Sequence, residues 1–510
     1  MRYLLGIDLG TSKIKADIYD TDGVLFGGSY REIKMLESNK NWKEQDPGIW
    51  WGLLKSILKD ISVEKHFDLK KIVGIGICGQ SHGPTPFNKN KENLGPCITW
   101  MDQRCTEQVR FIEKVVGREK ILSITSFDLD VAYTAAKILW IKENQFDIYK
   151  HTEKFLFPKD VLVLKLTGNY STDITDASAT NLFDVKKQEW SIEIFKELKI
   201  SLDKFPEPNP PEKVVGETIY SIAEETGLRK GIPVVAGGAD WATNFYGAGG
   251  IKPNLGIDMS GTVGALAVTI DKNFVGGKRL LTSIVPEVKL LYVSGLQTAA
   301  SLLQWGRDEF CLPEKYVSKR IGKNAFELMD EEIKKVSPGS NGIFVYPHFE
   351  GQRYPGNPDL KGVIFGLSIS TKREYIFRAI LEGVAYEYRK DLESSQELKS
   401  IKCKKIMTSG GGSRSDVWNQ IKADILGIPY YKSNILEAGT FGAAMLAGVG
   451  IGIYDNLLKP IEEFSKIEKI YHPIKENSLI YNQYYEFYKN FTKNIDKRHL
   501  FKGYDRLKLI

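Results

Sequence analysis

The fold of this chain is decided by the stretch Leu5-Gly6-Ile7-Asp8-Leu9-Gly10-Thr11-Ser12-Lys13. An apolar strand enters it, and an alternating apolar run that predicts a second strand leaves it. The turn between the two strands carries an acid, a glycine, two hydroxyls and a cation. Backbone N–H groups, a lysine charge and a metal-bound carboxylate can together surround a polyphosphate. A plain hairpin turn uses the same residue types, so the stretch alone leaves both interpretations open.

A second copy of this pattern occurs later in the chain. Leu255-Gly256-Ile257-Asp258-Met259-Ser260-Gly261-Thr262 repeats Leu-Gly-Ile-Asp and Gly-Thr, with one residue inserted before the Gly-Thr pair. Another alternating apolar run follows it. Two such strand–turn–strand units predict duplicated domains that face each other across one ligand.

Length and composition favour a two-domain globular protein. At 510 residues the chain is too long for one core. Hydrophobic residues make up 42% and charged residues 26% of it, as in ordinary globular proteins. The net charge of +6 is spread along the chain. No basic block is dense enough to predict binding to nucleic acid or to a membrane surface.

The cysteines and the N-terminus predict a cytoplasmic protein. Five cysteines are present without Cys-x-x-Cys spacing, which favours reduced thiols over disulfides or a zinc site. The chain begins with strand sequence instead of a signal peptide, and no apolar run is long enough to cross a bilayer. The six histidines are scattered and build no metal cluster.

A glycine-rich run marks the predicted domain boundary. Gly247-Ala248-Gly249-Gly250-Ile251-Lys252-Pro253-Asn254 lies immediately before the second copy of the loop and is the candidate hinge. We therefore expect an N-terminal domain over residues 1–248 and a C-terminal domain with a helical tail over residues 249–510.

Other loops that follow predicted strands carry the remaining candidate residues. The apolar strand 71–78 ends at Gly79-Gln80-Ser81-His82-Gly83-Pro84, and ligands usually bind at the carboxyl end of such a strand. A third glycine turn, Gly410-Gly411-Gly412-Ser413, also follows a strand. Since glycines let a backbone approach a polyphosphate closely, three such turns favour a nucleotide site.

Two acids carry the predicted chemistry, and each has a structural alternative. Asp8 can position Mg²⁺, or it can accept hydrogen bonds from its own turn. Asp240 lies between a strand and a helix, where it can cap the helix, accept a substrate proton, or do both.

A second group of side chains predicts a sugar site. His82 can orient a hydroxyl group or make a structural hydrogen bond. Trp100, Asp102 and Arg104 combine stacking with polar contacts, as a sugar site does, but a buried salt bridge would use the same residues.

These motifs, in this order, resemble the FGGY carbohydrate kinases over nearly the whole chain, and within them the xylulokinases. Asp8-Leu9-Gly10-Thr11-Ser12 resembles the N-terminal phosphate loop, Gln80-Ser81-His82-Gly83 the substrate loop, and Trp100-Met101-Asp102-Gln103-Arg104 the Trp-x-Asp-x-Arg element. Lys159-Asp160 and Thr175-Asp176-Ala177-Ser178 match further landmarks. Gly238-Ala239-Asp240 falls where that group has its catalytic aspartate, and Gly410-Gly411-Gly412 resembles its adenosine-binding segment.

The resemblance implies two ribonuclease H-like, actin-type α/β domains with ATP and sugar meeting in a central cleft. It implies an ATP-dependent kinase that phosphorylates a hydroxyl of a ketopentose, with xylulose expected, Asp240 as general base and Mg²⁺ held near Asp8. Domain closure about the Gly247–Pro253 hinge would assemble the site. Homodimers are common in the family. The residues expected to bind nucleotide are Thr11, Ser12, Lys13, Gly261, Thr262, Gly411, Gly412 and Ser415, and those expected at the sugar are Ser81, His82, Trp100, Asp102, Arg104 and Trp241.

Two departures concern the substrate. Ser81 stands where xylulokinases usually have Met, and Trp241 where they usually have Asn. Both changes alter the wall of the sugar pocket, so another ketose, a polyol or an aldonate is the alternative substrate. A non-sugar actin-like ATPase is the alternative from another class. It would share the phosphate loops but would not need the Gln80–Gly83 and Trp100–Arg104 elements.

Overall fold

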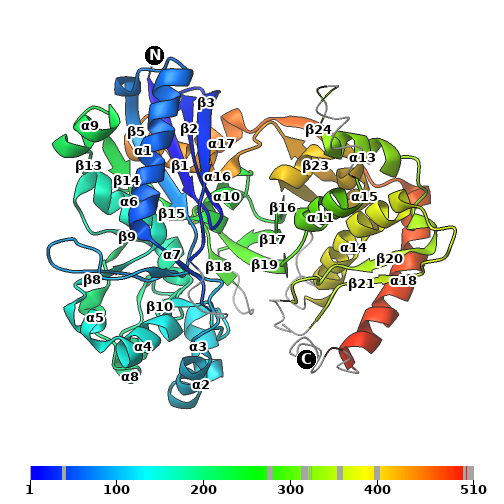
Figure 1. Ribbon diagram of the computed structural model, residues 1–510, viewed down its shortest axis with the longest axis horizontal. Helices are drawn as coiled ribbons and strands as arrows, with labels where there is room; N and C mark the ends of the chain where they lie inside the picture. The colour runs from blue at the N-terminus through cyan, green and yellow to red at the C-terminus, as the bar shows by residue number, and fades with distance from the viewer. Residues whose placement is uncertain are drawn as a thin grey trace. The chain divides into compact units, whose positions relative to one another are not determined.

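The computed structural model describes residues 2–36, 42–272, 280–311, 320, 322, 324–352, 360–395, 403–497 and 501. The chain forms two compact units (Figure 1). Unit 1 comprises Met1–Ile251, Lys272–Leu290 and Glu437–Ser465. Unit 2 comprises Lys252–Asp271, Leu291–Leu436 and Lys466–Ile510. The predicted α/β class with two duplicated sheet domains is confirmed.

Unit 1 is built on a mixed sheet with the order β13-β14-β5-β1-β2-β3, and β15 also pairs with β5. The opening stretch forms β1, the tight turn and β2, as predicted. β1 runs antiparallel to β2 and parallel to β5, so the loops after β1 and β5 emerge at the same edge. The strands are β1 (Tyr3–Leu9), β2 (Lys13–Asp20), β3 (Leu25–Glu32), β5 (Ile72–Gly79), β13 (Val214–Glu217), β14 (Pro233–Val235) and β15 (Gly238–Ala239).

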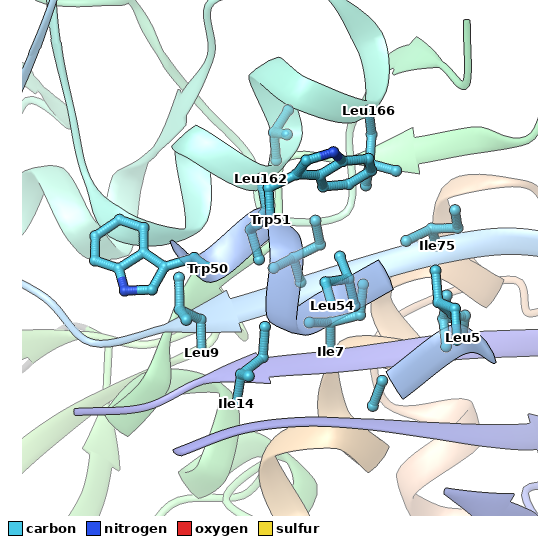
Figure 2. Packing of buried hydrophobic residues seen from close by; sticks show 14 of the residues in the cluster. Leu5, Ile7, Leu9, Ile14, Trp50, Trp51, Leu54, Ile75, Leu162 and Leu166 are labelled. Carbon is cyan, nitrogen blue, oxygen red and sulfur yellow. The ribbon is translucent and has the colours of Figure 1, made fainter. Parts of the chain in front are cut away.

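One face of this sheet carries the main hydrophobic core. Apolar side chains alternate along β1, and its odd-numbered residues pack with helix α1 (Pro47–Glu64). Asp46 caps α1 by accepting a hydrogen bond from the Gly48 N–H, as the Asp-Pro pair predicts. Figure 2 shows this core, in which Trp50, Trp51 and Leu54 of α1 lie with Leu5, Ile7, Leu9, Ile14 and Ile75 of the sheet and with Leu162 and Leu166.

The opposite face of the same sheet is covered by α16 (Ala438–Gly450), which comes from late in the chain. A Cβ atom placed on Gly6 would lie 1.9 Å from the Thr440 carbonyl oxygen, and one on Gly76 would lie 1.8 Å from the Ala443 oxygen. Only glycine permits so close an approach of helix and strand. The compact units are therefore not consecutive halves of the chain. The predicted domain boundary between residues 248 and 249 stays a prediction.

The remaining elements of unit 1 surround this sheet and a second apolar cluster. The helices are α2 (Thr106–Val115), α3 (Arg118–Thr125), α4 (Thr134–Asn144), α5 (Phe146–His151), α6 (Pro158–Thr167), α7 (Ile174–Ser178), α8 (Ile192–Glu197), α9 (Tyr220–Thr226), α10 (Asp240–Gly247) and α17 (Lys459–Phe464). The short strands form pairs: β4 (Glu44–Gln45) with β7 (Cys97–Ile98), β6 (Thr85–Phe87) with β8 (Lys154–Leu156), β9 (Thr172–Asp173) with β12 (Pro208–Asn209), and β10 (Phe183–Asp184) with β11 (Glu189–Trp190).

Unit 2 repeats the topology around the second copy of the loop. β16 (Leu255–Ser260) runs antiparallel to β17 (Gly264–Asp271) and parallel to β22 (Lys405–Ser409). The register places Asp258 opposite Thr408, as it places Asp8 opposite Cys78 in unit 1. The sheet also contains β18 (Leu280–Thr282), β19 (Val288–Leu296), β23 (Tyr430–Ser433) and β24 (Ile467–Tyr471), in the order β18-β19-β17-β16-β22-β23-β24.

Helices pack around this second sheet, and the aromatic tail forms one of them as predicted. α18 (Lys475–Lys497) buries Tyr481, Tyr485 and Tyr488. The hydroxyls of Tyr481 and Tyr488 donate to Glu382 and Glu387. Those two acids lie on α14 (Arg373–Ser394), and the other elements are α11 (Ala300–Phe310), α13 (Ala325–Ile333), α15 (Asp416–Leu426), β20 (Phe344–Tyr346) and β21 (Val363–Phe365). Within the part of the chain that the structure describes, no helix is both long and apolar enough to cross a bilayer.

Candidate functional site

In unit 1, acids from β1, α7 and α10 surround Cys78 near the carboxyl end of β5. Cys78 lies opposite Asp8 across β1 and β5, and opposite Gly238 across β5 and β15. Burial raises the pKa of the Cys78 thiol well above its usual value, and the charges of Asp8, Asp240 and Asp176 raise it further. The three carboxylates therefore lie close enough to Cys78 to raise the pKa of its thiol. The loops that carry Asp8 and Asp240 were singled out from sequence, and the structure brings them together.

Asp8 has the environment of a cation ligand. The residue keeps some exposure, but its Oδ1 atom is buried and has no hydrogen-bond partner among the described residues. Burial raises its pKa to about 6, while a hydrogen bond with Cys78 and the charge of Lys15 oppose that rise. A bound cation would offset the cost of this burial. Among the described residues no group of three or more His, Cys, Asp or Glu side chains could hold a metal.

A glycine keeps α16 close to this carboxylate. A Cβ atom on Gly439, in the first turn of α16, would lie 2.6 Å from Asp8 Oδ2 and 3.0 Å from Asn244 Nδ2. The neighbouring Glu437 pairs with Lys15 at 2.7 Å. Sequence reasoning missed α16 at this site. The sequence contains one signal for it, the small-residue run Ala438-Gly439-Thr440-Phe441-Gly442-Ala443-Ala444. Such a helix can approach the glycines of β1 and β5 closely, because both surfaces lack large side chains.

Asp240 begins helix α10 but does not cap it. Ala239 is the N-cap residue, and Asp240 occupies the first helical position. Its Oδ1 accepts a hydrogen bond of 2.7 Å from the Trp241 N–H. The capping alternative from the sequence is thus displaced by one residue, because the two-residue strand β15 ends at Ala239. The half-buried Asp240 carboxylate lies at the positive end of α10, which favours a negative charge there.

The loop after β5 supplies Ser81 and His82. Ser81 is buried, and its hydroxyl has no hydrogen-bond partner among the described residues. Burial raises the pKa of the nearby Asp176 well above its usual value. His82 has a positive φ of 71° and places its Nδ1 2.6 Å from the Ala179 carbonyl oxygen. Since a carbonyl only accepts, Nδ1 carries the proton. The structural hydrogen bond that the sequence left open for His82 is present, and it fixes the orientation of the ring.

Trp100 links the substrate element to the phosphate loop. Its Nε1 donates to Thr11 Oγ1 at 2.7 Å. Gln45, which sequence reasoning missed, donates from Nε2 to the Thr11 carbonyl oxygen at 2.6 Å and accepts from Gln80 Nε2 at 2.7 Å. The turn after β1 and the loop after β5 are therefore held together. Ser12 and Lys13 lie exposed beside this turn.

Asp102 and Arg104 form a buried salt bridge. Arg104 Nε and Nη2 donate to the two Asp102 carboxylate oxygens at 2.8 and 2.7 Å, and Nη2 also contacts Glu44 at 2.8 Å. The guanidinium lies 3.8 Å from the ring centre of Trp42. The structural alternative raised for this pair is thus realised. Its predicted contact with sugar stays a prediction, and Arg104 Nη1 is a buried donor without a hydrogen-bond partner among the described residues.

In unit 2 two glycine turns meet at the carboxyl ends of β16 and β22. A Cβ atom on Gly412 would lie 2.8 Å from the Ser260 oxygen, so this glycine is required for close packing. Gly411 is exposed and has open space, and Gly261 and Thr262 are partly or fully exposed. The predicted glycine turn after a strand is present: Gly411–Arg414 is a 3₁₀ turn after β22, and α15 begins at Asp416.

Ser415 has structural partners. Its hydroxyl accepts from the Trp418 N–H as the cap of α15 and donates to Asp330 Oδ1 at 3.0 Å. Its predicted contact with nucleotide stays a prediction.

The chain matches the models of the FGGY family of carbohydrate kinases, N-terminal domain over residues 3–247 and C-terminal domain over residues 271–451. It is 31% identical over 500 residues to a xylulose kinase of Lactococcus lactis, covering 97% of both chains. It is 27% identical to a gluconokinase of Bacillus subtilis, covering 94% of this chain and 97% of that one.

The fold matches that of a ligand-bound xylulose kinase from Lactobacillus acidophilus, with a TM-score of 0.86, 22% identity and coverage of 97% of this chain and 99% of that one. The two family models together match well over half of the chain. This chain therefore belongs to the FGGY family of carbohydrate kinases.

Proposed function

We propose that this carbohydrate kinase transfers the γ-phosphate of ATP to a hydroxyl of xylulose. The observation that carries the proposal is the convergence of Asp8 and Asp240 beside Cys78 in unit 1. One carboxylate there accepts the proton of the sugar hydroxyl, and the other holds the cation of the phosphate donor. The similarity to a xylulose kinase at 31% identity supports the choice of sugar.

Asp240 is the proposed general base. Its position in the first turn of α10 favours the ionised form that can take up a proton. The proton of the attacking hydroxyl passes to an Asp240 carboxylate oxygen as the hydroxyl oxygen attacks the γ-phosphorus. His82, whose ring is fixed by the Ala179 carbonyl, orients a second sugar hydroxyl. Trp100, Asp102, Arg104, Ser81 and Trp241 are proposed to shape the sugar pocket.

Asp8 is the proposed ligand of Mg²⁺. Its buried, unpartnered Oδ1 fits this ion, which keeps several waters and binds through one or two carboxylates together with substrate phosphates. When bound, Mg²⁺ neutralises charge on the phosphates. Thr11 accepts the Trp100 N–H at Oγ1, so its own O–H can donate to a phosphate oxygen. Ser12, Lys13, Gly261, Thr262, Gly411, Gly412 and Ser415 are the further proposed nucleotide contacts.

We place the reaction in the cytoplasm, where ATP is available. All five cysteines are free thiols, as a reducing compartment favours. A homodimer stays a prediction, which light scattering of the purified chain would test.

The experiment is sugar-dependent release of ADP, measured with a panel of xylulose, ribulose, fructose, gluconate and glycerol. We expect the highest kcat/KM with xylulose. A strict preference for gluconate would instead place this chain with the gluconokinase that it also resembles. Release of ADP that no sugar stimulates would contradict the proposed phosphoryl transfer.

The pocket wall offers a second test of the substrate. Ser81→Met and Trp241→Asn restore the residues expected in xylulokinases. If Ser81 and Trp241 line the sugar site, the double variant should change the ratio of kcat/KM between xylulose and the other sugars. An unchanged ratio across the whole panel would remove both residues from the pocket.

A further inference from the structure

We infer that Thr175 is a positioning residue for phosphoryl transfer, because its hydroxyl holds the peptide that precedes Asp240. The inference rests on the proposed role of Asp240 as general base. Thr175 lies on α7, 64 residues before Ala239, and the resemblance that singled out both segments assigns no contact between them.

The hydroxyl of Thr175 makes two hydrogen bonds, and its partners fix which one it donates and which one it accepts. The Ala239 N–H donates to Thr175 Oγ1 at 2.8 Å, and Thr175 Oγ1 donates its proton to Asp173 Oδ2 at 2.5 Å. A backbone N–H can only donate, and an ionised carboxylate can only accept. The single proton of the hydroxyl therefore points at Asp173, and its lone pair at Ala239. Thr175 and Asp173 are both fully buried, which strengthens these bonds.

Asp173 is itself held in place by charge. Lys159 Nζ lies 3.0 Å from Asp173 Oδ1, and it also pairs with Asp160 and, at 3.5 Å, with Asp176. The lysine and the three acids are fully buried. Asp173 further accepts the Thr175 N–H at 2.6 Å. Both oxygens of Asp173 are thus engaged, because Oδ1 pairs with Lys159 and Oδ2 accepts from the N–H and the hydroxyl of Thr175.

The start of α10 needs such an anchor. β15 has only two residues, Gly238 and Ala239, so its ladder with β5 is short. Ala239 is the N-cap of α10, but its side chain makes no capping hydrogen bond. The bond from its N–H to Thr175 therefore adds a lateral restraint directly before Asp240. Misplacing a catalytic group by about 1 Å can cost on the order of a hundredfold in rate.

The test compares Thr175→Val with Thr175→Ser. Valine keeps the shape of threonine and removes the hydroxyl, whereas serine keeps the hydroxyl. We expect Thr175→Val to lower kcat by about tenfold to a hundredfold, with the KM for ATP within about twofold. Thr175→Ser should recover most of kcat. The matched control is Thr180→Val, because the Thr180 hydroxyl is equally buried but donates to Ala177 and accepts from Leu182 instead.

The Asp240→Asn background separates this inference from the proposed function. If Thr175 acts through Asp240, Thr175→Val should slow the residual reaction of Asp240→Asn by less than about twofold. An equal loss in both backgrounds would overturn the positioning role. So would an unchanged kcat in Thr175→Val while Asp240→Asn is strongly impaired. Full activity of Asp240→Asn would instead overturn the proposed base. Thermal unfolding of each variant checks that the fold is intact.

Discussion

Lys422 Nζ lies 2.6 Å from Asp258 Oδ2, and both side chains are completely buried. Asp258 is the counterpart of Asp8 in the second copy of the loop. Lys422 also donates to Ser260 Oγ at 2.7 Å, and that hydroxyl donates to Asp258. The carboxylate of unit 2 is therefore neutralised by the protein itself, whereas Asp8 keeps a buried oxygen without a hydrogen-bond partner. The two loops share the strand–turn–strand backbone, but the protein neutralises only the Asp258 carboxylate. Of the two carboxylates, Asp8 is therefore the one suited to bind a cation.

Breaking this pair should destabilise unit 2. Lys422→Met leaves the Asp258 charge buried and unpaired, which typically costs about 3–5 kcal/mol. The double variant Asp258→Asn/Lys422→Met removes both charges and should recover much of that loss. Urea unfolding measures the difference. If the double variant is no more stable than Lys422→Met, the penalty does not come from the unpaired charge.

Asp240→Asn should lower kcat by about a hundredfold to ten-thousandfold, because it removes the proposed general base. The affinity for ATP should stay nearly unchanged. Steady-state ADP release and ATP titration measure the two effects. Asp455→Asn is the control, since Asp455 is exposed and pairs only with Lys459 among the contacts found for it. Retention of most activity in Asp240→Asn would assign proton removal to another group.

Gly439→Ala should raise the Mg²⁺ concentration that the reaction needs without destabilising the fold. The added Cβ would lie 2.6 Å from Asp8 Oδ2 and push the carboxylate away, although alanine is favoured over glycine in a helix. We expect the Mg²⁺ concentration for half-maximal activity to rise by about tenfold, which corresponds to about 1.4 kcal/mol.

Gly52→Ala on α1 is the matched control, because nothing lies within 4 Å of its added Cβ. It should keep the normal Mg²⁺ requirement. An unchanged requirement in Gly439→Ala as well would argue against a metal at Asp8.

Glu387 should make the free energy of unfolding depend on pH in the acid range. Burial alone would raise its pKa, but Lys390 and His348, which contact its two oxygens at 2.7 and 3.0 Å, lower it to about 2. A carboxylate with a lowered pKa stabilises the fold above the unfolded pKa of about 4.5. That contribution is lost as the pH falls from about 4.5 towards 2. Glu387→Gln should therefore lower the urea midpoint at pH 6 and lower it less at pH 3.

Glu393→Gln provides the comparison for this pH dependence, because Glu393 lies on the same helix with a side chain 47% exposed. Its effect should be small at both pH values. A loss in Glu387→Gln that is equal at pH 6 and pH 3 would contradict the role of the carboxylate charge.

The local parts of the fold were predictable from the sequence, because they depend on short-range signals. The duplicated Leu-Gly-Ile-Asp strand and Gly-Thr turn predicted both sheets, and the apolar run 71–78 predicted β5. The placement of α16 was not predictable in this way. It depends on a fit between Gly6 and Thr440, residues that no local pattern connects.

Asp8, His82 and Asp240 could be proposed from the sequence because they lie at or just after the ends of predicted strands, and parallel strands end at one edge of a sheet. Gln45 and the role of Thr175 could not, because both depend on side-chain hydrogen bonds that form only after folding. The sequence also could not show that Asp258 is neutralised, since Lys422 lies 164 residues away.

The packing of α16 on the first sheet has a consequence for synthesis on the ribosome. One face of that sheet lacks its covering helix until Glu437–Ser465 has been translated. At about 5–20 residues per second, the interval from Ile251 to Glu437 lasts roughly ten to forty seconds. During that time the nascent chain exposes the glycine-lined face of β1 and β5. The first domain to be translated is therefore completed only when nearly the whole chain has been made.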